Sequence, residues 1–532
     1  MKFQFLTLLL LSSSIAASAQ SFSWSNQIGS DNYDQAIDMA IDAQNNLYLT
    51  GTFADTLDTP NLSLSSNGQQ DIFITKYTPE GNLVWASKIG SNGYDAVKNI
   101  TVDAQNNSYL TGSTSDTLII QTDSIKTQST ADSELFLAKV DANGNSQWLR
   151  RISTTGSGSI TDLQTDPLGN SYVLGYFQDT LVFNTDSLVS AGQTDMFMAK
   201  YDANGNLLWK IQAGGTKSDL PWALALDANG NLYVSGNFQG TTLFGSTILD
   251  SGNSYDNFVA KYDTNGGILW AKQIHSTSFI GSQIVAAPNG TIYLGGNFDN
   301  NTNFETDTLT TISGSDLVVA QYTADGTLNW VKTFGDANAY NILNKLATDA
   351  NSNIYLNGWF VNTLSFGVHP LQAVGNEDAF VAKLSPDGIA LWAISYGGSS
   401  YDEASALAIG NNGFCYTAGA ITDTVVVNNE TINSSGMLDA VLMQIDQSII
   451  TSSPTLLMPK QAIFARPNPA TNYLYINSQT SNCTYQLLDL SGKIVAQTSD
   501  NSLEVSTLAR GMYLLQEWKD TNLLSIQKII LQ

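Results

Sequence analysis

The stretch Asp195-Met-Phe-Met-Ala-Lys-Tyr-Asp-Ala-Asn-Gly-Asn-Leu-Leu-Trp209 decides the fold of this chain, because near copies of it recur along the sequence. It begins with a mostly apolar run, as a buried strand does. The Asp-Ala-Asn-Gly-Asn segment that follows suits a tight hairpin turn, since Asn and Gly tolerate positive φ. The stretch therefore predicts two antiparallel strands, the second of which carries Trp209.

The tryptophan of this stretch recurs at steps of 60 to 63 residues, and a tyrosine followed three residues later by glycine keeps the same step. The seven copies are Trp24, Trp85, Trp148, Trp209, Trp270, Trp330 and Trp392; Tyr48, Tyr109, Tyr172, Tyr233, Tyr293, Tyr355 and Tyr416; and Gly51, Gly112, Gly175, Gly236, Gly296, Gly358 and Gly419. Such periodicity indicates stacked structural units. We interpret these residues as packing and close-approach positions between units rather than as catalytic groups.

Each unit is predicted to hold four strands, and the phase of the repeat predicts a closed ring. The repeat region begins with a Trp strand, 22–29, that has no third strand before it, whereas the last unit ends with a third strand, 439–445, that has no Trp strand after it. Pairing these two strands leaves no open edge. The sequence therefore predicts an all-β, seven-bladed β-propeller over residues 20–446, with a linear β-solenoid as the structural alternative.

The unit also resembles a known family. The pattern Asp-x-Phe-x-Ala-Lys-Tyr-Asp-x-x-Gly-Asn-x-x-Trp, followed by Ile-Gly-Ser, Ala-x-x-x-Ala-x-Asp and Tyr-Leu-Thr-Gly, is similar to the bacterial SBBP-type β-propeller repeat over residues 22–446. This resemblance implies a fold and does not imply an activity, because propellers serve binding, scaffolding and catalysis alike.

The N-terminus predicts export. Lys2, an apolar run over 3–11 and Ala17-Ser18-Ala19 are typical of a signal peptide that ends at residue 19. No later stretch is long and apolar enough to predict a transmembrane segment. The expected location is the extracellular space or the outer-membrane surface.

Composition excludes several partners and sites. The formal net charge of -25, from 22 Lys plus Arg against 47 Asp plus Glu, argues against nucleic acid as a partner. Two His and two Cys in 532 residues argue against zinc sites and a disulfide framework, and Cys415 and Cys483 are expected to be thiols. We expect no cofactor and no metal; calcium at the Asp-rich turns is the alternative, although those turns lack the loop length and bidentate Glu of an EF-hand.

The last part of the chain is predicted to be a second module. Residues 447–463 read as a linker, and 464–532 as a small β-sandwich. The strings Arg466-Pro-Asn-Pro-Ala-Thr-Asn-Tyr-Leu-Tyr-Ile476, Leu488-Asp-Leu-Ser-Gly-Lys-Ile-Val495 and Leu508-Ala-Arg-Gly-Met-Tyr-Leu-Leu515 resemble the type A C-terminal sorting domain of the type IX secretion system, found in Bacteroidota. This resemblance implies that the secretion machinery is a partner of this module. The implied sorting residues are Pro467, Asn468, Pro469, Asp489, Gly492, Lys493, Gly511 and Tyr513.

Candidate ligand-binding residues lie in the connections from each Trp strand to the next unit, which are expected to reach one mouth of the channel. They combine aromatic rings with carboxylates, a mixture that suits stacking on sugars or gripping peptide groups. The alternative is that the rings plug the channel and the Asp residues cap turns. The candidates are Tyr33, Asp34, Tyr94, Asp95, Asp219, Trp222, Phe279, Tyr340, Tyr401 and Asp402.

The sequence favours a secreted or surface-attached protein that binds an unidentified protein or glycan. The alternatives are a carboxylate-dependent polysaccharide hydrolase or lyase, and a purely structural surface protein. The repeat-breaking Glu305, Glu377 and Glu430 show no convergence in sequence, and His275 and His369 fall in different units. We therefore predict no catalytic residues. A recurring Asp-Thr-Leu, at Asp55, Asp116, Asp179 and Asp307, resembles an O-glycosylation acceptor motif, with strand geometry as the alternative explanation.

Overall fold

The computed structural model of the chain describes residues 21–59, 62–121, 123–126, 134–276, 282–298, 302–304, 307–311, 314–337, 339–427, 430–446, 464–466, 470–477, 483–488, 494–519 and 522–531. Every regular element in these ranges is a strand, which confirms the all-β prediction. The chain separates into two compact units, one within Ala19–Gln447 and one within Ser448–Gln532. The predicted signal peptide, 1–19, and the predicted linker, 447–463, lie outside the described residues.

In the larger unit, the described strands group into seven antiparallel sets of four, each named here by its innermost strand. From the innermost strand outward the sets are β2 (Asp34–Ile41), β3 (Leu47–Phe53), β6 (Asp71–Tyr77) and β7 (Leu83–Ile89); β8 (Asp95–Val102), β9 (Ser108–Thr114), β12 (Glu134–Val140) and β13 (Ser146–Thr154); β14 (Gly158–Thr165), β15 (Ser171–Phe177), β18 (Asp195–Tyr201) and β19 (Leu207–Gly215); β20 (Asp219–Leu226), β21 (Leu232–Phe244), β22 (Thr247–Tyr262) and β23 (Ile268–Ile274); β24 (Gln283–Ala286), β25 (Ile292–Phe298), β28 (Asp316–Tyr322) and β29 (Leu328–Phe334); β30 (Tyr340–Thr348), β31 (Ile354–Val361), β34 (Asp378–Leu384) and β35 (Ala390–Tyr396); and β36 (Glu403–Ile409), β37 (Cys415–Ile421), β40 (Asp439–Asp446) and β1 (Ser21–Ile28).

Short hairpins between the second and third strands reach back to the preceding set. Gly90, just after β7, exchanges two backbone hydrogen bonds with Ile119 of the next set, at 3.1 and 3.0 Å. In the β20 set the hairpin is continuous with β21 and β22. The contact covers part of each outer strand edge, which would otherwise be open to pairing with other chains. The β16 (Thr180–Phe183) and β17 (Asp186–Val189) hairpin pairs directly with β13. The separate hairpins are β4 (Thr56–Thr59) with β5 (Leu62–Ser65), β10 (Leu118–Ile120) with β11 (Asp123–Ile125), β26 (Thr302–Phe304) with β27 (Asp307–Leu309), β32 (Thr363–Phe366) with β33 (His369–Gln372), and β38 (Thr424–Val427) with β39 (Glu430–Asn433).

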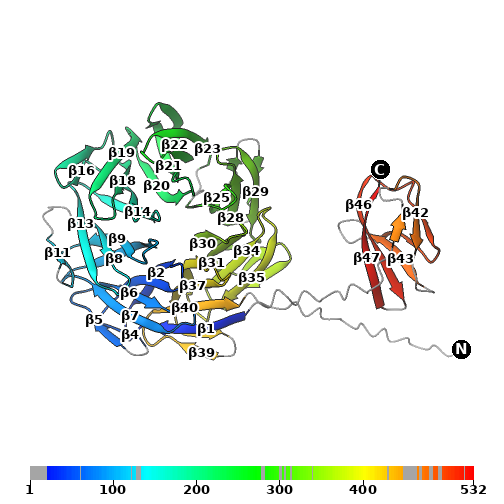
Figure 1. Cartoon of the computed structure of the whole chain (residues 1–532), viewed down its shortest axis with the longest axis horizontal. Coiled ribbons are helices and arrows are strands. Elements are labelled where there is room, and N and C mark those ends of the chain that lie inside the picture. The colour runs from blue at the N-terminus through cyan, green and yellow to red at the C-terminus, as the bar shows by residue number, and fades with distance from the viewer. Residues whose placement is uncertain are drawn as a thin grey trace. The chain divides into compact units, whose positions relative to one another are not determined.

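The sets form a closed ring, and Figure 1 shows the blue β1 lying beside the orange β40. Each innermost strand contacts the next around the ring: β2 with β8, β8 with β14, β14 with β20, β20 with β24, β24 with β30, β30 with β36 and β36 with β2. The closing pair joins the two ends of this unit, because β1 pairs with β40 in the register Ser21 to Asp446 through Ile28 to Ala440. Apolar clusters fill the space between neighbouring sets, as where Ile72 and Ile74 pack with Leu110 and Phe136.

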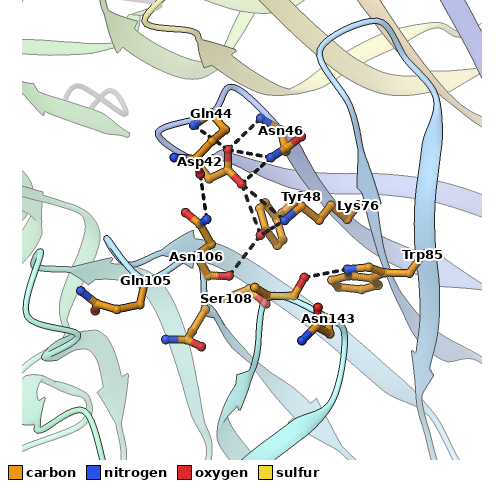
Figure 2. Close-up of polar contacts among 12 residues, drawn as sticks. Asp42, Gln44, Asn46, Tyr48, Lys76, Trp85, Gln105, Asn106, Ser108 and Asn143 are labelled. Carbon is orange, nitrogen blue, oxygen red and sulfur yellow. Dashed lines mark hydrogen bonds and ion pairs between the residues drawn. The ribbon is translucent and has the colours of Figure 1, made fainter.

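The recurring Trp, Tyr and Lys side chains connect one set to the next (Figure 2). Trp85 Nε1 donates to the carbonyl of Ala142 in the next set at 3.1 Å. Tyr48 Oη donates to the carbonyl of Asn106 at 3.1 Å and accepts from Lys76 Nζ at 2.6 Å. These contacts explain why the two aromatic residues keep the step of the repeat.

The smaller unit holds two antiparallel sheets over one apolar cluster, which includes Leu474, Leu487, Leu515 and Ile529. Cys483 is buried here, as Cys415 is in the larger unit. The first sheet contains β41 (Phe464–Arg466), β42 (Tyr473–Asn477) and β45 (Ser502–Glu504); the second contains β44 (Ile494–Thr498), β43 (Thr484–Leu488), β46 (Gly511–Lys519) and β47 (Asn522–Leu531).

Candidate functional site

Four of the predicted ligand-binding residues form an exposed arc of tyrosines at the end of the ring where the innermost strands begin, here called the loop face. Tyr33, Tyr94, Tyr340 and Tyr401 are 56%, 58%, 48% and 54% exposed. They occupy equivalent positions, because each makes an isolated parallel bridge to the residue just before a third strand of the neighbouring set. Their sets, in the order β30, β36, β2 and β8, follow one another around the ring. We call these four residues the tyrosine arc.

The four predicted aspartates are buried beneath this surface. Asp34, Asp95, Asp219 and Asp402 are at most 1% exposed. Each carboxylate accepts a backbone N–H four residues earlier, from Ser30 at 2.6 Å, Ser91 at 2.6 Å, Gly215 at 2.8 Å and Gly398 at 2.7 Å respectively. The alternation of side chains along a strand explains the arrangement, since an outward Tyr is followed by an inward Asp. These aspartates therefore close the connections that carry the arc and do not present oxygens at its surface.

Burial changes the protonation of these carboxyl groups. It raises the pKa of Asp34 to about 7, and the charge of Asp439 adds to the increase while the N–H of Ser30 opposes it. Burial also raises the pKa of Asp219 to about 7 and that of Asp402 to about 6. A fraction of these groups is accordingly protonated near neutral pH.

A second group of buried aspartates explains a glycine at the end of the Trp strand. Asp71 packs against Gly90, where an added Cβ would lie 2.2 Å from the Asp71 Cγ. The equivalent distances to Asp195 at Gly214 and to Asp378 at Gly397 are 2.3 and 2.4 Å. A side chain at Gly90, Gly214 or Gly397 would collide with the carboxylate, so these three sets require glycine there, whereas the equivalent positions of two other sets hold Ser153 and His275.

An acidic pocket of about 660 Å³ opens on the loop face between the β36 and β2 sets, within the span of the arc. In the described part of the chain, no Lys, Arg or His forms an ion pair with Asp31, Asp55 or Asp58. Asn32 Nδ2 donates to Asp55 Oδ2. The lining residues are Gln27, Gly29, Ser30, Asp31, Asn32, Asp55, Thr56, Asp58, Thr59 and Ser435.

Sequence reasoning missed a pair of glutamates at the other end of the arc. Glu377 bridges to Tyr401, two residues before Glu403, and Gln35 Nε2 donates to Glu403 Oε1. Burial raises the pKa of Glu377, and the charge of Glu403 adds to the increase. The sequence did contain a sign of this pair, because other units have glutamine at both positions. Gln70 corresponds to Glu377, and Gln35 corresponds to Glu403. Of the repeat-breaking glutamates named from the sequence, Glu305 lies outside the described residues.

A half-buried tryptophan extends the aromatic surface at this end. The ring of Trp359 on β31 lies 5.7 Å from the ring of Tyr340, with 30° between the planes. Trp222 is half-buried at a β-bulge of β20, between Pro221 and Ala223, and Phe279 lies outside the described residues. The structure thus places Trp359, which the sequence did not single out, beside the arc.

A third cluster of charges lies inside the ring, in a cavity of about 370 Å³ lined by the innermost strands. Lys345 Nζ is 2.9 Å from Asp38 Oδ1. Burial lowers the pKa of Lys345, but the charges of Asp38 and Asp162 outweigh this and leave it raised. Asp162 accepts the backbone N–H of Leu224 at 2.6 Å. All the charges of this cluster have partners, which indicates a structural role.

Other candidate chemistry has local structural partners. His275 Nδ1 lies 2.9 Å from Asp256 Oδ2, and His369 lies in a different set. In the Asp-rich turns, Asp42 Oδ1 accepts the N–H groups of Gln44 and Asn46 at 3.0 and 2.8 Å. In the part of the chain that the structure describes, no three His, Cys, Asp or Glu residues gather as a metal would require.

The Asp-Thr-Leu motif has a conformational explanation at two of its sites. Asp55 and Asp179 adopt φ of 60° and 62°, and the following Leu57 and Leu181 are fully buried. Asp tolerates this left-handed conformation better than most residues do. A left-handed residue before a buried leucine therefore accounts for the Asp-Thr-Leu motif at Asp55 and Asp179.

Of the predicted sorting residues, two are described. Gly511 begins β46, and Tyr513 is buried and donates through Oη to the carbonyl of Ala509 at 2.7 Å. The other six lie outside the described residues: Pro467, Asn468, Pro469, Asp489, Gly492 and Lys493.

Curated relatives match this chain over part of their length. An uncharacterised WD repeat-containing protein of Acanthamoeba polyphaga mimivirus is 26% identical over 489 residues, which cover 73% of this chain and 35% of the relative. The regulatory protein FlaEY of Caulobacter vibrioides is 26% identical over 321 residues, covering 54% of this chain and 33% of the relative. The chain thus spans about a third of the length of these relatives.

Similar solved structures include PorZ, a surface component of the type IX secretion system of Porphyromonas gingivalis, at 10% identity and a TM-score of 0.26, covering 93% of this chain and 81% of PorZ. A puromycin hydrolase structure matches at 10% identity and a TM-score of 0.40, covering 93% of this chain and 60% of the hydrolase.

The tail matches a described family directly. Residues 465–532 match the family described as the secretion system C-terminal sorting domain. No helix in the described ranges has the length and apolar character needed to cross a membrane. The match confirms the type IX sorting tail predicted from its motifs, and such a sorting domain implies export to the cell surface or the extracellular space.

Proposed function

We propose that the ring is a seven-bladed β-propeller of the SBBP-repeat type that binds a protein or glycan partner through its loop face, without catalysing a reaction. The signal peptide would take the chain across the inner membrane, and the sorting tail, as a small sandwich, would be recognised by the secretion machinery. The observation that carries the proposal is the tyrosine arc, since four large rings on successive sets are about half exposed.

The arc has the properties of a binding surface. Tyrosines supply large contact area at low conformational-entropy cost and are enriched at the centres of protein interfaces. The buried aspartates beneath them fix the connections, so little ordering is needed on binding. An exposed aromatic cluster on a rigid scaffold is otherwise a liability for solubility.

The test is a binding screen with the purified secreted protein against arrays of glycans and bacterial surface proteins. We expect specific partners to be retained, and Tyr33→Ala with Tyr401→Ala to weaken retention at least about tenfold. The matched control is Leu208→Ala with Leu269→Ala, which removes exposed apolar side chains from β19 and β23. Equal retention by the tyrosine variant and the wild type would contradict the proposal.

A second candidate function is favoured by the glutamate pair. Glycan hydrolysis uses two carboxyl groups whose environments differ, and the pKa of Glu377 is raised by burial and by the charge of Glu403. Turnover of any polysaccharide that is abolished in Glu377→Gln would establish this alternative. A protein with neither binding nor turnover would fit a structural role at the cell surface.

A further inference from the structure

The tyrosine arc is accompanied by carboxylates that have no cationic partner among the described residues. They occur in two places, the acidic pocket and the Glu377–Glu403 pair, with Tyr401 beside the pair and Tyr33 next to the pocket residues Asp31 and Asn32. Elsewhere the fold pairs its lysines with aspartates, as in Lys76 with Asp42 and Lys383 with Asp349. The loop face therefore keeps unneutralised charge where its aromatic rings are exposed.

Two buried carboxyl groups lie beneath the acidic pocket. Gly29 lines the acidic pocket, and a Cβ at Gly29 would lie 2.8 Å from Asp439 Oδ1 and 3.2 Å from Asp34 Oδ2. Asp34 and Asp439 are fully buried, and the Oδ1 atom of each has no hydrogen-bond partner in the described part of the chain. A cation in the pocket would favour the ionised form of these two carboxyl groups, whereas a neutral ligand would not.

The ring already shows how it accommodates a cation between a carboxylate and an aromatic face. Lys76 Nζ lies 4.6 Å from the centre of the Tyr48 ring and 3.4 Å from Asp42 Oδ2. The same Lys-over-Tyr contact recurs at Tyr109, Tyr172, Tyr233 and Tyr355. The loop face carries the same two kinds of group, because Tyr401 is bridged to Glu377 and Tyr33 follows Asp31 and Asn32 of the pocket.

We infer that the loop face binds a basic segment of a partner protein, whose Lys or Arg side chains enter the acidic pocket and the Glu377–Glu403 pair while the tyrosine arc packs on their aliphatic stems. The inference rests on the proposed function and narrows its partner to one class. Charge complementarity with the net charge of -25 also favours fast capture of a basic partner.

The experiment measures retention of the purified full-length secreted chain on two immobilised probes: synthetic 15-residue peptides of graded Lys and Arg content, and neutral glycans. We expect retention to rise with peptide charge and to fall at least about tenfold between about 50 and about 500 mM NaCl. Asp31→Asn with Asp58→Asn should reduce peptide retention by about tenfold. The matched control is Glu80→Gln with Asp387→Asn, which removes two charges at exposed positions in the turns after β6 and β34 and should change retention less than about twofold.

The outcomes separate this inference from the proposed function. Retention of neutral glycans that depends on Tyr33 and Tyr401 but not on salt or on Asp31 and Asp58 would overturn the basic partner and leave the binding function in place. Retention of basic peptides equally reduced by both charge variants would also overturn it, because net charge alone would then explain capture. No retention of either probe would overturn the basic partner and leave the proposed function to the array screen, whereas retention unaffected by the tyrosine substitutions would overturn both.

Discussion

Lys76 Nζ lies 3.4 Å from Asp42 Oδ2 at the junction between the β2 and β8 sets, and this pairing follows a rule across the ring. Five sets carry Asp at the start of the first turn, and all five carry Lys on the third strand opposite the recurring Tyr: Asp42 and Lys76, Asp103 and Lys139, Asp166 and Lys200, Asp227 and Lys261, Asp349 and Lys383. The two sets with Ala287 or Gly410 at the turn carry Gln321 or Gln444 instead.

The rule has an electrostatic cause. A buried ammonium group without a carboxylate is costly. Lys261 donates to the carbonyl of Ala324 at 2.9 Å, and the uncharged amide of Gln321 donates to the equivalent carbonyl of Pro386 at 2.9 Å. A set that lacks the turn aspartate therefore also lacks the lysine.

The first prediction concerns this exchange. Asp42→Ala should lower the free energy of unfolding by about 3 kcal/mol, because it leaves Lys76 buried without its counter-charge. Adding Lys76→Gln should recover much of the loss, since it recreates the Ala287 and Gln321 combination. Calorimetric melting of both single variants and the double variant checks this as a double-mutant cycle. A double variant as unstable as the sum of the singles would show that the two residues act independently.

The second prediction is that the ring loses stability as pH rises from about 4 to about 7. The folded-state pKa of Asp34 and of Asp219 is raised to about 7, above the value near 3.8 of an unfolded chain. For a raised pKa, the stabilising contribution is complete below the unfolded value and is lost as pH rises through the folded value. The melting temperature should therefore be several degrees higher at pH 5 than at pH 8.

The control for this pH dependence is Asp34→Asn with Asp219→Asn. Asparagine cannot ionise and already occupies the equivalent position as Asn341. The melting temperature of this double variant should change less between pH 5 and pH 8 than that of the wild type. An unchanged pH slope in the variant would assign the effect to other groups.

The third prediction concerns the charges inside the ring. Lys345→Met should lower stability by about 3 kcal/mol at pH 8, because Asp38 and Asp162 would then be left without a nearby cation. Burial raises the pKa of Asp162 to about 6, so acidification to pH 5 should protonate it and reduce the loss. Melting curves at both pH values check this, and a loss of equal size at both would indicate that Lys345 contributes by packing alone.

The fourth prediction concerns the glycines after the Trp strands. Gly90→Ala should be strongly destabilising, since its Cβ would lie 2.2 Å from Asp71 Cγ. Combining it with Asp71→Ala should remove the collision and restore part of the stability. Melting temperatures of the two single variants and the double variant decide the matter; a double variant no more stable than Gly90→Ala would place the strain in the backbone.

The strand pattern of the ring was predictable because every unit repeats the same strand and turn motifs. The steps of Trp85 and Tyr48 mark equivalent strands, and the unmatched strands at 22–29 and 439–445 predicted the pairing of β1 with β40 that the structure contains. The equivalence of the exposed tyrosines could also be inferred from the sequence, since neighbouring units repeat the same connection, whereas their part in binding stays a prediction.

The details that depend on side-chain direction or on distant strands were not predictable in the same way. The sequence predicts Asp34 as a ligand-binding candidate beside Tyr33, with turn capping as the alternative, and could not decide between them because this depends on which side of the strand Asp34 faces. Asp38, Asp162 and Lys345 meet only because the ring brings β2, β14 and β30 around one cavity. Glu377 and Glu403 belong to different sets, so their proximity required the junction between β34 and β36.

The most direct measurement for the central claim is hydroxyl-radical footprinting of the secreted protein with and without a partner recovered from the arrays. Binding through the loop face predicts at least about threefold lower labelling of Tyr33, Tyr94, Tyr340 and Tyr401, with Tyr473 and Tyr475 of the sorting unit unchanged. Unchanged labelling of the arc in the complex, with protection elsewhere on the ring, would contradict the account.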